Sequence, residues 1–393
     1  MDFEPDDEQR AVVETTRAFV RKELMPHEEE VERTGRLDLD VAIELRNKAI
    51  RAGLYAANMP EDIGGGGLDT LTWMLMEREL GHTGFALQMF AVARPSPILL
   101  ACAGAQREDY LLPTVAGDRV ECLAMTEPEA GSDLRGMRTR AVRDGSDWVI
   151  TGTKHFISHV DHSDYIVLFA ATGEDETSPA GDGTRRRQAQ ITAFLVDTDT
   201  PGLEVLPGYR SVSHRGYDNF VLAFDGARVP ADAVLGEVGA GFSVATTWLG
   251  TTRLQVAATC LGRAQRALDL AVGHAVSRRQ FGTSIGRNQG VSFQLADMAT
   301  AIEAASLLTW RAASLVDVGR QDDTAIAMAK LSATETLAKV ADSALQIHGG
   351  MGLMDELPLE RIWRDARVER IWDGTSEIQR HIISRSLLRA RGG

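Results

Sequence analysis

The sequence has few cysteines, no long apolar segment and no export signal. Its three cysteines, Cys102, Cys122 and Cys260, are far apart in 393 residues and lie in apolar stretches. This distribution indicates reduced, buried thiols rather than a disulfide framework or a metal cluster. No stretch of about 18 apolar residues occurs, and the acidic N-terminus precedes no apolar run, so neither a membrane span nor a signal peptide is expected. We therefore expect a soluble, cytoplasmic protein without membrane insertion.

Positive charge is also scarce and scattered. The formal net charge is −14, and the longest basic run covers only 185–187. Because such a surface repels a phosphate backbone, we expect no nucleic-acid partner, and an anionic ligand would need a local basic pocket. With 44% hydrophobic and 25% charged residues the composition is ordinary for a globular protein. The chain is too long for one core, so two or three domains are expected.

Three regions of different periodicity divide the chain. Apolar residues recur at three and four positions in 1–117, which predicts an N-terminal α-helical domain. Short β-type runs separated by turn residues predict a middle β domain, barrel-like or a sandwich, over 118–237, in which the polar stretch 172–188 is expected to be a solvated loop. Helical periodicity returns over 238–393 and predicts a C-terminal bundle of the four-helix type. The predicted fold class is α+β.

The C-terminal region has the clearest helix boundaries. Long helices with an apolar face are expected at 242–278, 289–318 and 323–348, followed by shorter ones at 359–371 and 376–389. At about 1.5 Å per residue the first helix would span more than roughly 50 Å, a length that suits antiparallel packing in a bundle.

Glycine-rich and histidine-rich segments invite ligand sites that their settings do not support. The glycine runs in 64–67, 236–241 and 349–352 lack the strand-turn-helix setting of a dinucleotide fingerprint. His155, His159 and His162 are close in sequence, but an extended strand would point the third away from the first two. A strand end that runs into a polar turn accounts for these histidines, and no metal site is expected.

One segment, AMTEPEAGSDL at 124–134, points to a cofactor. Its small residues and hydroxyl groups let a planar, polar molecule approach the backbone closely. Four further segments follow, KHFIS (154–158), RRQFG (278–282), QIHGGMG (346–352) and WDGTSEIQR (372–380). In order and spacing the five segments resemble the acyl-CoA dehydrogenase family, in its medium- and short-chain architecture, over nearly the whole chain. The resemblance implies FAD as the cofactor.

The resemblance also assigns residues to the flavin. Met125, Thr126 and Ser132 would line the flavin ring and ribityl chain, and Phe156 and Ser158 would pack on the other side. Phe156 stands where many relatives carry tryptophan, which keeps an aromatic wall.

In this family each subunit also contributes to the flavin site of its neighbour. The positions that match this role are Arg278, Phe281, Gln289, Gln346, Gly349 and Gly350, and Arg278 would pair with the pyrophosphate. Thr375 and Glu377 match positions close to the adenosine half, although Glu377 also fits an exposed charge on the last helix. The resemblance therefore implies a homo-oligomer, a dimer of dimers.

The family reaction removes the α-proton of an acyl-CoA thioester while a hydride passes from the β-carbon to flavin N5, and an electron-transferring flavoprotein receives the electrons. Asp373 aligns with the usual glutamate base. Its shorter side chain withdraws the carboxylate by about 1.5 Å, and a misplacement of about 1 Å costs roughly 100-fold in rate unless the site adjusts. Thr252, at the alternative base position of some relatives, cannot act as a base.

Three interpretations of Asp373 stay open. The site has adjusted to it and the enzyme is an ordinary dehydrogenase. Alternatively the substrate differs, because aspartate bases occur in nitroalkane oxidases of this superfamily and in enzymes that desaturate cyclic carboxyl-CoA esters, and the enzyme then could use oxygen as nitroalkane oxidases and acyl-CoA oxidases do. A third interpretation is a catalytically silent protein that binds flavin or CoA.

Several further residues are candidates for substrate binding. Arg253 matches a family arginine that helps to hold CoA, and Ser132, Trp372 and Gly374 are placed beside the substrate. Arg94 is a charge in the apolar stretch VARPSPILL. It either forms an ion pair or faces the acyl pocket and selects a polar or carboxylated acyl group.

Overall fold

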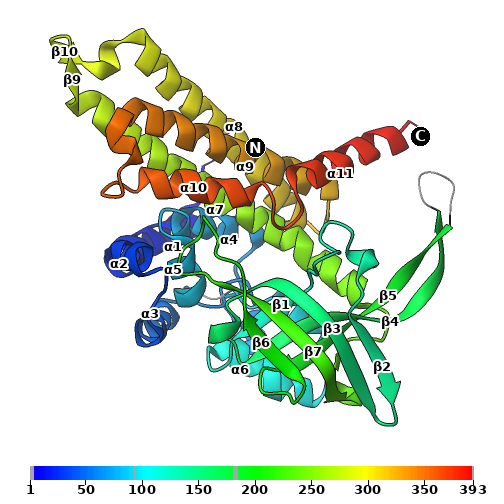
Figure 1. Ribbon diagram of the computed structural model, residues 1–393. Helices are drawn as coiled ribbons and strands as arrows, with labels where there is room; N and C mark the ends of the chain where they lie inside the picture. The colour runs from blue at the N-terminus through cyan, green and yellow to red at the C-terminus, as the bar shows by residue number, and fades with distance from the viewer. Residues whose placement is uncertain (1–3, 93, 180–184, 392–393) are drawn as a thin grey trace.

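The computed structural model describes residues 4–92, 94–179 and 185–391. Along these residues a helical domain, a sheet domain and a helical bundle follow one another (Figure 1). The α+β class predicted from the sequence is confirmed. None of the helices formed by these residues is long and apolar enough to cross a membrane.

The N-terminal domain consists of short helices with polar caps. Asp6 and Gln9 form a capping box at the start of the first helix, and Asp69 caps the fourth by accepting a hydrogen bond from Thr72 N. The helices are α1 (Asp7–Phe19), α2 (Glu28–Thr34), α3 (Leu39–Arg51), α4 (Thr70–Leu80), α5 (Phe85–Ala91) and α6 (Leu112–Ala116).

The middle domain is one twisted sheet. Its strands are β1 (Glu121–Ala124), β2 (Arg140–Asp144), β3 (Asp147–Ser158), β4 (Tyr165–Pro179), β5 (Arg185–Asp197), β6 (Leu203–Pro207), β7 (Asn219–Pro230) and β8 (Val234–Leu235). Within the described ranges the order is β6-β7-β3-β2-β4-β5-β8, and β1 pairs in parallel with β4.

Strand β4 joins the two cores of the molecule. Alternate side chains of a strand point to opposite faces. Tyr165 and Phe169 pack into the core shared with the helical domains, whereas Ile166 and Leu168 pack into the core of the sheet domain. Because both faces are covered, this part of the sheet is a fixed support for the residues that flank it.

The prediction of a loop over 172–188 is wrong for its described residues. Strands β4 and β5 continue as an antiparallel pair to Pro179 and from Arg185, and residues 180–184 lie outside the described part. Backbone pairing along the hairpin stabilises strands that the polar composition alone did not predict.

The C-terminal domain is built on three long helices. They are α7 (Gly241–Ser277), α8 (Gln289–Asp317) and α9 (Asp323–His348), and they are followed by α10 (Leu359–Glu369) and α11 (Ser376–Arg389). All five helices are confirmed, with ends within two residues of those predicted. A side chain at Gly262 of α7 would lie 1.9 Å from Arg78 O, so this glycine permits the close crossing of α7 and α4.

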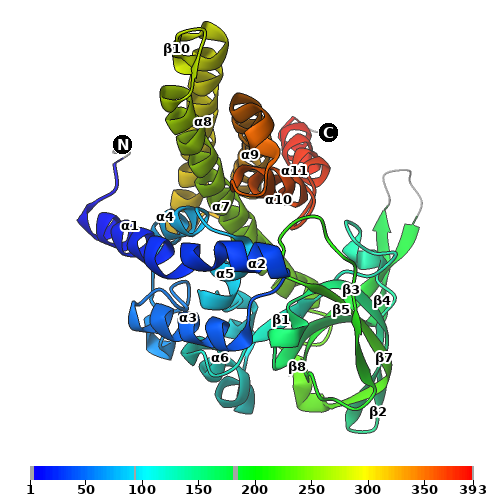
Figure 2. The same cartoon turned by 60° about the vertical axis from the view of Figure 1, so that its left-hand side comes forward.

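A two-stranded hairpin, β9 (Arg279–Gln280) and β10 (Thr283–Ser284), connects α7 to α8. Figures 1 and 2 both place it at the far end of the bundle, away from the sheet domain. Cys102, Cys122 and Cys260 are buried and unpaired, as the sequence predicted.

Candidate active site

A cavity of about 850 Å³ lies where the three domains meet. Its wall is formed by the ends of β1 and β3, one face of α7 and the loop between α10 and α11. The cavity brings together many of the candidate residues, namely Arg94, Met125, Thr126, Ser132, Phe156, Ser158, Arg253, Trp372, Asp373, Gly374 and Thr375. Segments separated by more than 200 positions in sequence therefore meet at one site.

The remaining candidates do not reach this cavity within one chain. Arg278, Phe281, Gln289, Gln346, Gly349 and Gly350 are all exposed and belong to the hairpin end of the bundle or the turn after α9. Phe281 is 100% exposed, which is unusual for a phenylalanine. Glu377 is exposed in the first turn of α11.

The loop that carries Asp373 is held by a buried lysine. Lys330 of α9 donates hydrogen bonds to the backbone oxygens of Glu369 (2.8 Å), Trp372 (3.0 Å) and Gly374 (2.9 Å). Asp373 has a φ of 52°, in the left-handed region that aspartate tolerates better than most residues, and Gly374 follows with a φ of 92°. Lys330 therefore fixes a tight turn that presents the Asp373 carboxyl to the cavity.

The Asp373 carboxyl is half-buried among groups of both signs. Burial raises its pKa to about 6, Glu369 also raises it, and Lys330 and Arg253 oppose the shift. Arg253 contacts the residue through the backbone, because its Nε donates to Asp373 O at 3.1 Å. A carboxylate with this pKa is ionised at neutral pH and is more basic than an exposed aspartate, which suits a general base.

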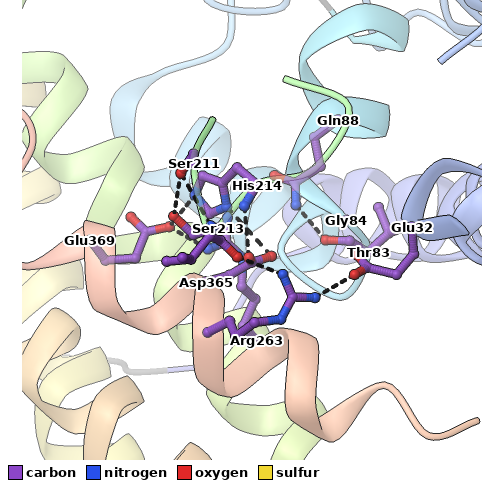
Figure 3. A network of polar contacts seen from close by, with 12 residues as sticks. Glu32, Thr83, Gly84, Gln88, Ser211, Ser213, His214, Arg263, Asp365 and Glu369 are labelled. Atoms are coloured by element: carbon purple, nitrogen blue, oxygen red, sulfur yellow. Dashed lines mark hydrogen bonds and ion pairs between the residues drawn. The ribbon is translucent and has the colours of Figure 1, made fainter. Parts of the chain in front are cut away.

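A second carboxylate, Glu369, lies four residues earlier on α10 and is fully paired (Figure 3). It accepts hydrogen bonds from Arg263, from His214 Nε2 at 3.0 Å and from Trp372 Nε1 at 2.8 Å. Burial opposes its ionisation, but Arg263 and His214 outweigh that effect and lower its pKa to about 2. Glu369 thus anchors the indole of Trp372, the residue next to Asp373.

His214 completes this network. Its backbone N donates to Asp365 Oδ1 at 2.7 Å. Burial opposes protonation of the ring, but Asp365 and Glu369 outweigh it and raise the pKa of His214. The side chains of Arg263, His214, Asp365 and Glu369 form a charge-balanced cluster beneath the Asp373 loop.

Another part of the cavity wall presents an aromatic surface and hydroxyl groups. An irregularity in the β3–β7 pairing between Lys154 and Ile157 turns Phe156, at φ 57°, out of the strand, and its side chain is 54% exposed. The Phe156 ring centroid lies 5.1 Å from that of Tyr209. Ser158 and Thr126 line the same cavity. These features fit a planar ring system that needs both aromatic contact and hydrogen bonds.

The segment that carries Met125 and Thr126 is also fixed by a buried lysine. Lys154 Nζ donates to Met125 O at 3.0 Å and forms an ion pair with Glu127 at 2.7 Å. His155 N donates to Thr126 O at 3.0 Å, which ties the segment to β3. The backbone here is therefore held in place from two sides.

Near α5 the cavity wall contains buried polar groups. Arg94 Nη2 and Nε pair with Glu77 at 2.6 and 2.7 Å, so the ion pair considered for Arg94 is confirmed, and Arg94 also lines the cavity. Burial lowers the pKa of His159 to about 4, and this neutral ring lies 3.0 Å from Tyr217 Oη through Nδ1. Among the described residues no group of three or more His, Cys, Asp or Glu side chains could hold a metal ion.

Sequence reasoning missed the supporting residues of the site. Glu77, Lys330, Glu369 and His214 were not singled out, although each is a charged or titratable residue. Glu77 and Lys330 lie in helical segments rich in apolar residues, where a charge that faces inward needs a partner. That signal could have indicated Glu77 and Lys330.

Comparison with known proteins places the whole chain in one family. Residues 6–118 match the N-terminal domain of acyl-CoA dehydrogenases, residues 122–227 the middle domain and residues 239–388 the C-terminal domain. The mitochondrial short-chain specific acyl-CoA dehydrogenase of Bos taurus is 38% identical over 96% of this chain and 89% of its own length.

Two solved structures share the fold. Butyryl-CoA dehydrogenase from Megasphaera elsdenii matches with a TM-score of 0.88 and 32% identity, over 99% of this chain and 100% of that one. A glutaryl-CoA dehydrogenase from Mycobacterium smegmatis in complex with FADH2 matches with a TM-score of 0.87 and 27% identity, over 98% of this chain and 95% of that one. The chain belongs to the acyl-CoA dehydrogenase family and is an oxidoreductase.

Proposed function

We propose that the protein is an FAD-dependent dehydrogenase that desaturates the α,β bond of an acyl-CoA thioester. The observation that carries the proposal is the half-buried Asp373 carboxyl, with a pKa of about 6, in a cavity of about 850 Å³ that aromatic and hydroxyl-bearing residues also line. The relatives named for short-chain acyl-CoA and butyryl-CoA substrates support this activity.

The residues present fit FAD. The exposed face of Phe156 offers contact to a planar ring, and Met125, Thr126, Ser132 and Ser158 line the adjoining wall. A relative of known structure was solved with FADH2. When bound, FAD supplies the acceptor for the hydride that leaves the β-carbon of the substrate. The protein's part is to hold the substrate between this wall and Asp373.

Asp373 is the proposed base. Its carboxylate takes the α-proton of the thioester, and burial makes that carboxylate more basic than it would be in water. The backbone N–H of Asp373 is the proposed donor to the thioester oxygen, because this amide belongs to the turn that Lys330 fixes. Thr252 also lines the cavity, but its hydroxyl cannot act as a carboxylate base.

Arg253 and the residues around Asp373 are the proposed contacts of the CoA moiety. Arg253 is half-buried at the cavity wall, and burial lowers its pKa. Its Nε is used by Asp373 O, which leaves the other guanidinium nitrogens available to an anionic or carbonyl group of the substrate. Trp372, Gly374 and Ser132 line the same cavity.

A second subunit would complete the cofactor site. The exposed positions Arg278, Phe281, Gln289, Gln346, Gly349 and Gly350 match the residues that family members supply to a neighbouring flavin, and Thr375 and Glu377 match positions near the adenosine half. Exposed apolar side chains on the same end, Phe281, Phe293, Met351 and Leu353, favour burial in an interface. We propose a dimer of dimers in the cytoplasm, with an electron-transferring flavoprotein as electron acceptor.

Anaerobic titration of the FAD-loaded protein with straight-chain acyl-CoA thioesters tests the proposal. We expect bleaching of the flavin absorption by at least one short-chain thioester. Asp373→Asn should slow bleaching by roughly 10²- to 10⁴-fold, the range for a lost general base. Asp355→Asn, an exposed position, is the matched control.

Two outcomes would replace the proposal. Rapid reoxidation of the reduced protein by air would indicate an oxygen-using enzyme, the subtype that an aspartate base also fits. A flavin that no acyl-CoA or nitroalkane bleaches would indicate a silent binding protein.

A further inference from the structure

The cavity wall contains a buried arginine, Arg94, whose hydrogen-bond donors are only partly matched by acceptors. The Arg94 side chain is 4% exposed and that of Glu77 is 0% exposed. Trp73 Nε1 and Gln255 Nε2 also donate to Glu77 Oε1, at 2.9 and 3.4 Å. Glu77 is therefore well supplied with donors, and its carboxylate fixes the Arg94 guanidinium at the cavity wall.

One nitrogen of Arg94 has no oxygen acceptor among the described residues. Nε and Nη2 donate to Glu77, whereas Nη1 contacts Met89 Sδ at 2.7 Å. A thioether is a weak acceptor. A buried N–H without a good acceptor destabilises the site, so a ligand oxygen that accepts from it would be favoured. Met89, Arg94 and Gln255 all line the cavity, so the Arg94 guanidinium belongs to the wall that a ligand in the cavity would contact.

The charges around Arg94 favour a neutral ligand group. Glu77 already balances the Arg94 cation at 2.6 Å. Glu121 lines the same cavity, accepts a hydrogen bond from Ser96 N at 2.7 Å and has its pKa raised by burial, and Asp373 adds a third carboxyl group. An additional carboxylate would be desolvated among acidic groups, whereas a neutral oxygen would meet no repulsion.

Arg46 is the competing cation. It lines the cavity, and its Nε is buried without a hydrogen-bond partner in the described part of the chain. Arg253 is the cation that contacts Asp373, and Arg46 and Arg94 are two further cations of the cavity wall.

We infer that Arg94 Nη1 donates a hydrogen bond to a neutral oxygen on the acyl chain, so that the preferred substrate is an oxo- or hydroxyacyl-CoA rather than a plain or carboxylated one. This inference rests on the proposed acyl-CoA dehydrogenase activity. It assigns Arg94 a role in specificity in addition to its structural ion pair with Glu77.

The test compares kcat/KM for matched acyl-CoA thioesters with an artificial electron acceptor. Each pair has equal chain length and differs by a ketone in place of a methylene on the fourth, fifth or sixth carbon. We expect the best ketone to exceed its plain partner by about 10-fold, as one hydrogen bond to a charged donor predicts. The isosteric carboxylate of that ketone should be the poorer substrate.

Arg94→Lys keeps a cation for Glu77 and removes the Nη1 donor. It should reduce the ketone preference to about 1, because the ammonium group is engaged by Glu77. Arg119→Lys, which alters another partly buried ion pair outside the cavity, should keep the preference. Thermal melting and the flavin spectrum check that Arg94→Lys stays folded and loaded. Met89→Leu, which replaces the thioether by a branched hydrocarbon side chain of similar volume, should keep the preference as well.

Three results separate the possibilities. Equal kcat/KM for ketone and plain chains in the unaltered enzyme would overturn the inference and leave the proposed function intact. If the enzyme preferred the carboxylated chain, and Arg46→Gln abolished that preference, the inference would be overturned and the substrate would be a carboxylated acyl-CoA. A flavin that no acyl-CoA reduces would overturn the proposed function itself.

Discussion

Asp373 and Glu369 are carboxylates four residues apart in opposite electrostatic situations. Glu369 is buried and Asp373 is half-buried, yet the pKa of Glu369 is lowered to about 2 and that of Asp373 is raised to about 6. Glu369 receives hydrogen bonds from Arg263, His214 and Trp372, whereas Lys330 and Arg253 bind the backbone around Asp373. The difference shows that direct side-chain pairing, more than burial, decides which carboxylate is structural and which is basic.

The comparison predicts that the same chemical change has opposite effects at the two positions. Glu369→Gln should destabilise the folded protein by about 3–5 kcal/mol at neutral pH, since it leaves Arg263 and His214 buried without their carboxylate. A lowered pKa means that this stabilisation is present above the ordinary value of 4.5 and is lost as the pH falls towards about 2. Denaturant unfolding at several pH values measures it, and a loss below about 1 kcal/mol would contradict the pairing.

Asp373→Asn should stabilise the protein. The folded-state pKa is raised from 3.8 to about 6, so ionisation of Asp373 disfavours folding increasingly between these values and fully above pH 6. Removing the charge should gain about 3 kcal/mol above pH 6 and nothing below pH 3.8, while catalysis is lost. Denaturant unfolding at several pH values measures this gain in the free energy of unfolding. If Glu369→Gln and Asp373→Asn destabilised the protein equally, the distinction between the two carboxylates would be wrong.

Lys330→Met should move the titration of the base. Lys330 lowers the pKa of Asp373, so its removal should raise the pH midpoint of kcat/KM by about one unit and reduce activity at pH values below the midpoint about 10-fold. Lys154→Met is the matched control, because Lys154 is equally buried but pairs with Glu127. If Lys330→Met lowered the stability but left the pH midpoint of kcat/KM unchanged, the role of Lys330 would be only to hold the turn.

The sequence predicted elements that depend on local pattern. The helix at Asp323–His348 was predicted with its bounds, because its apolar period continues without interruption to Gly349. The polar hairpin of β4 and β5 was missed, because its pairing partner, and not its composition, stabilises it. The five motifs predicted the family and many of the residues that meet in the cavity.

The electrostatics of the site could not be predicted in the same way. Lys330 reaches three carbonyl groups about 40 positions later in the chain, and Arg263 lies 106 positions from Glu369. These contacts exist only after the helices have packed. The left-handed backbone of Asp373 and the turning of Phe156 out of β3 are likewise consequences of the assembled structure.

The most direct test of Asp373 as the base is the pH dependence of kcat/KM for an acyl-CoA substrate. Because the carboxylate must be ionised to take a proton, the rate should rise with pH through a midpoint of about 6 and then level off. A midpoint near 3.8, the value of an ordinary aspartate, or a rate unchanged across this range would contradict the assignment of Asp373 as a half-buried, activated base.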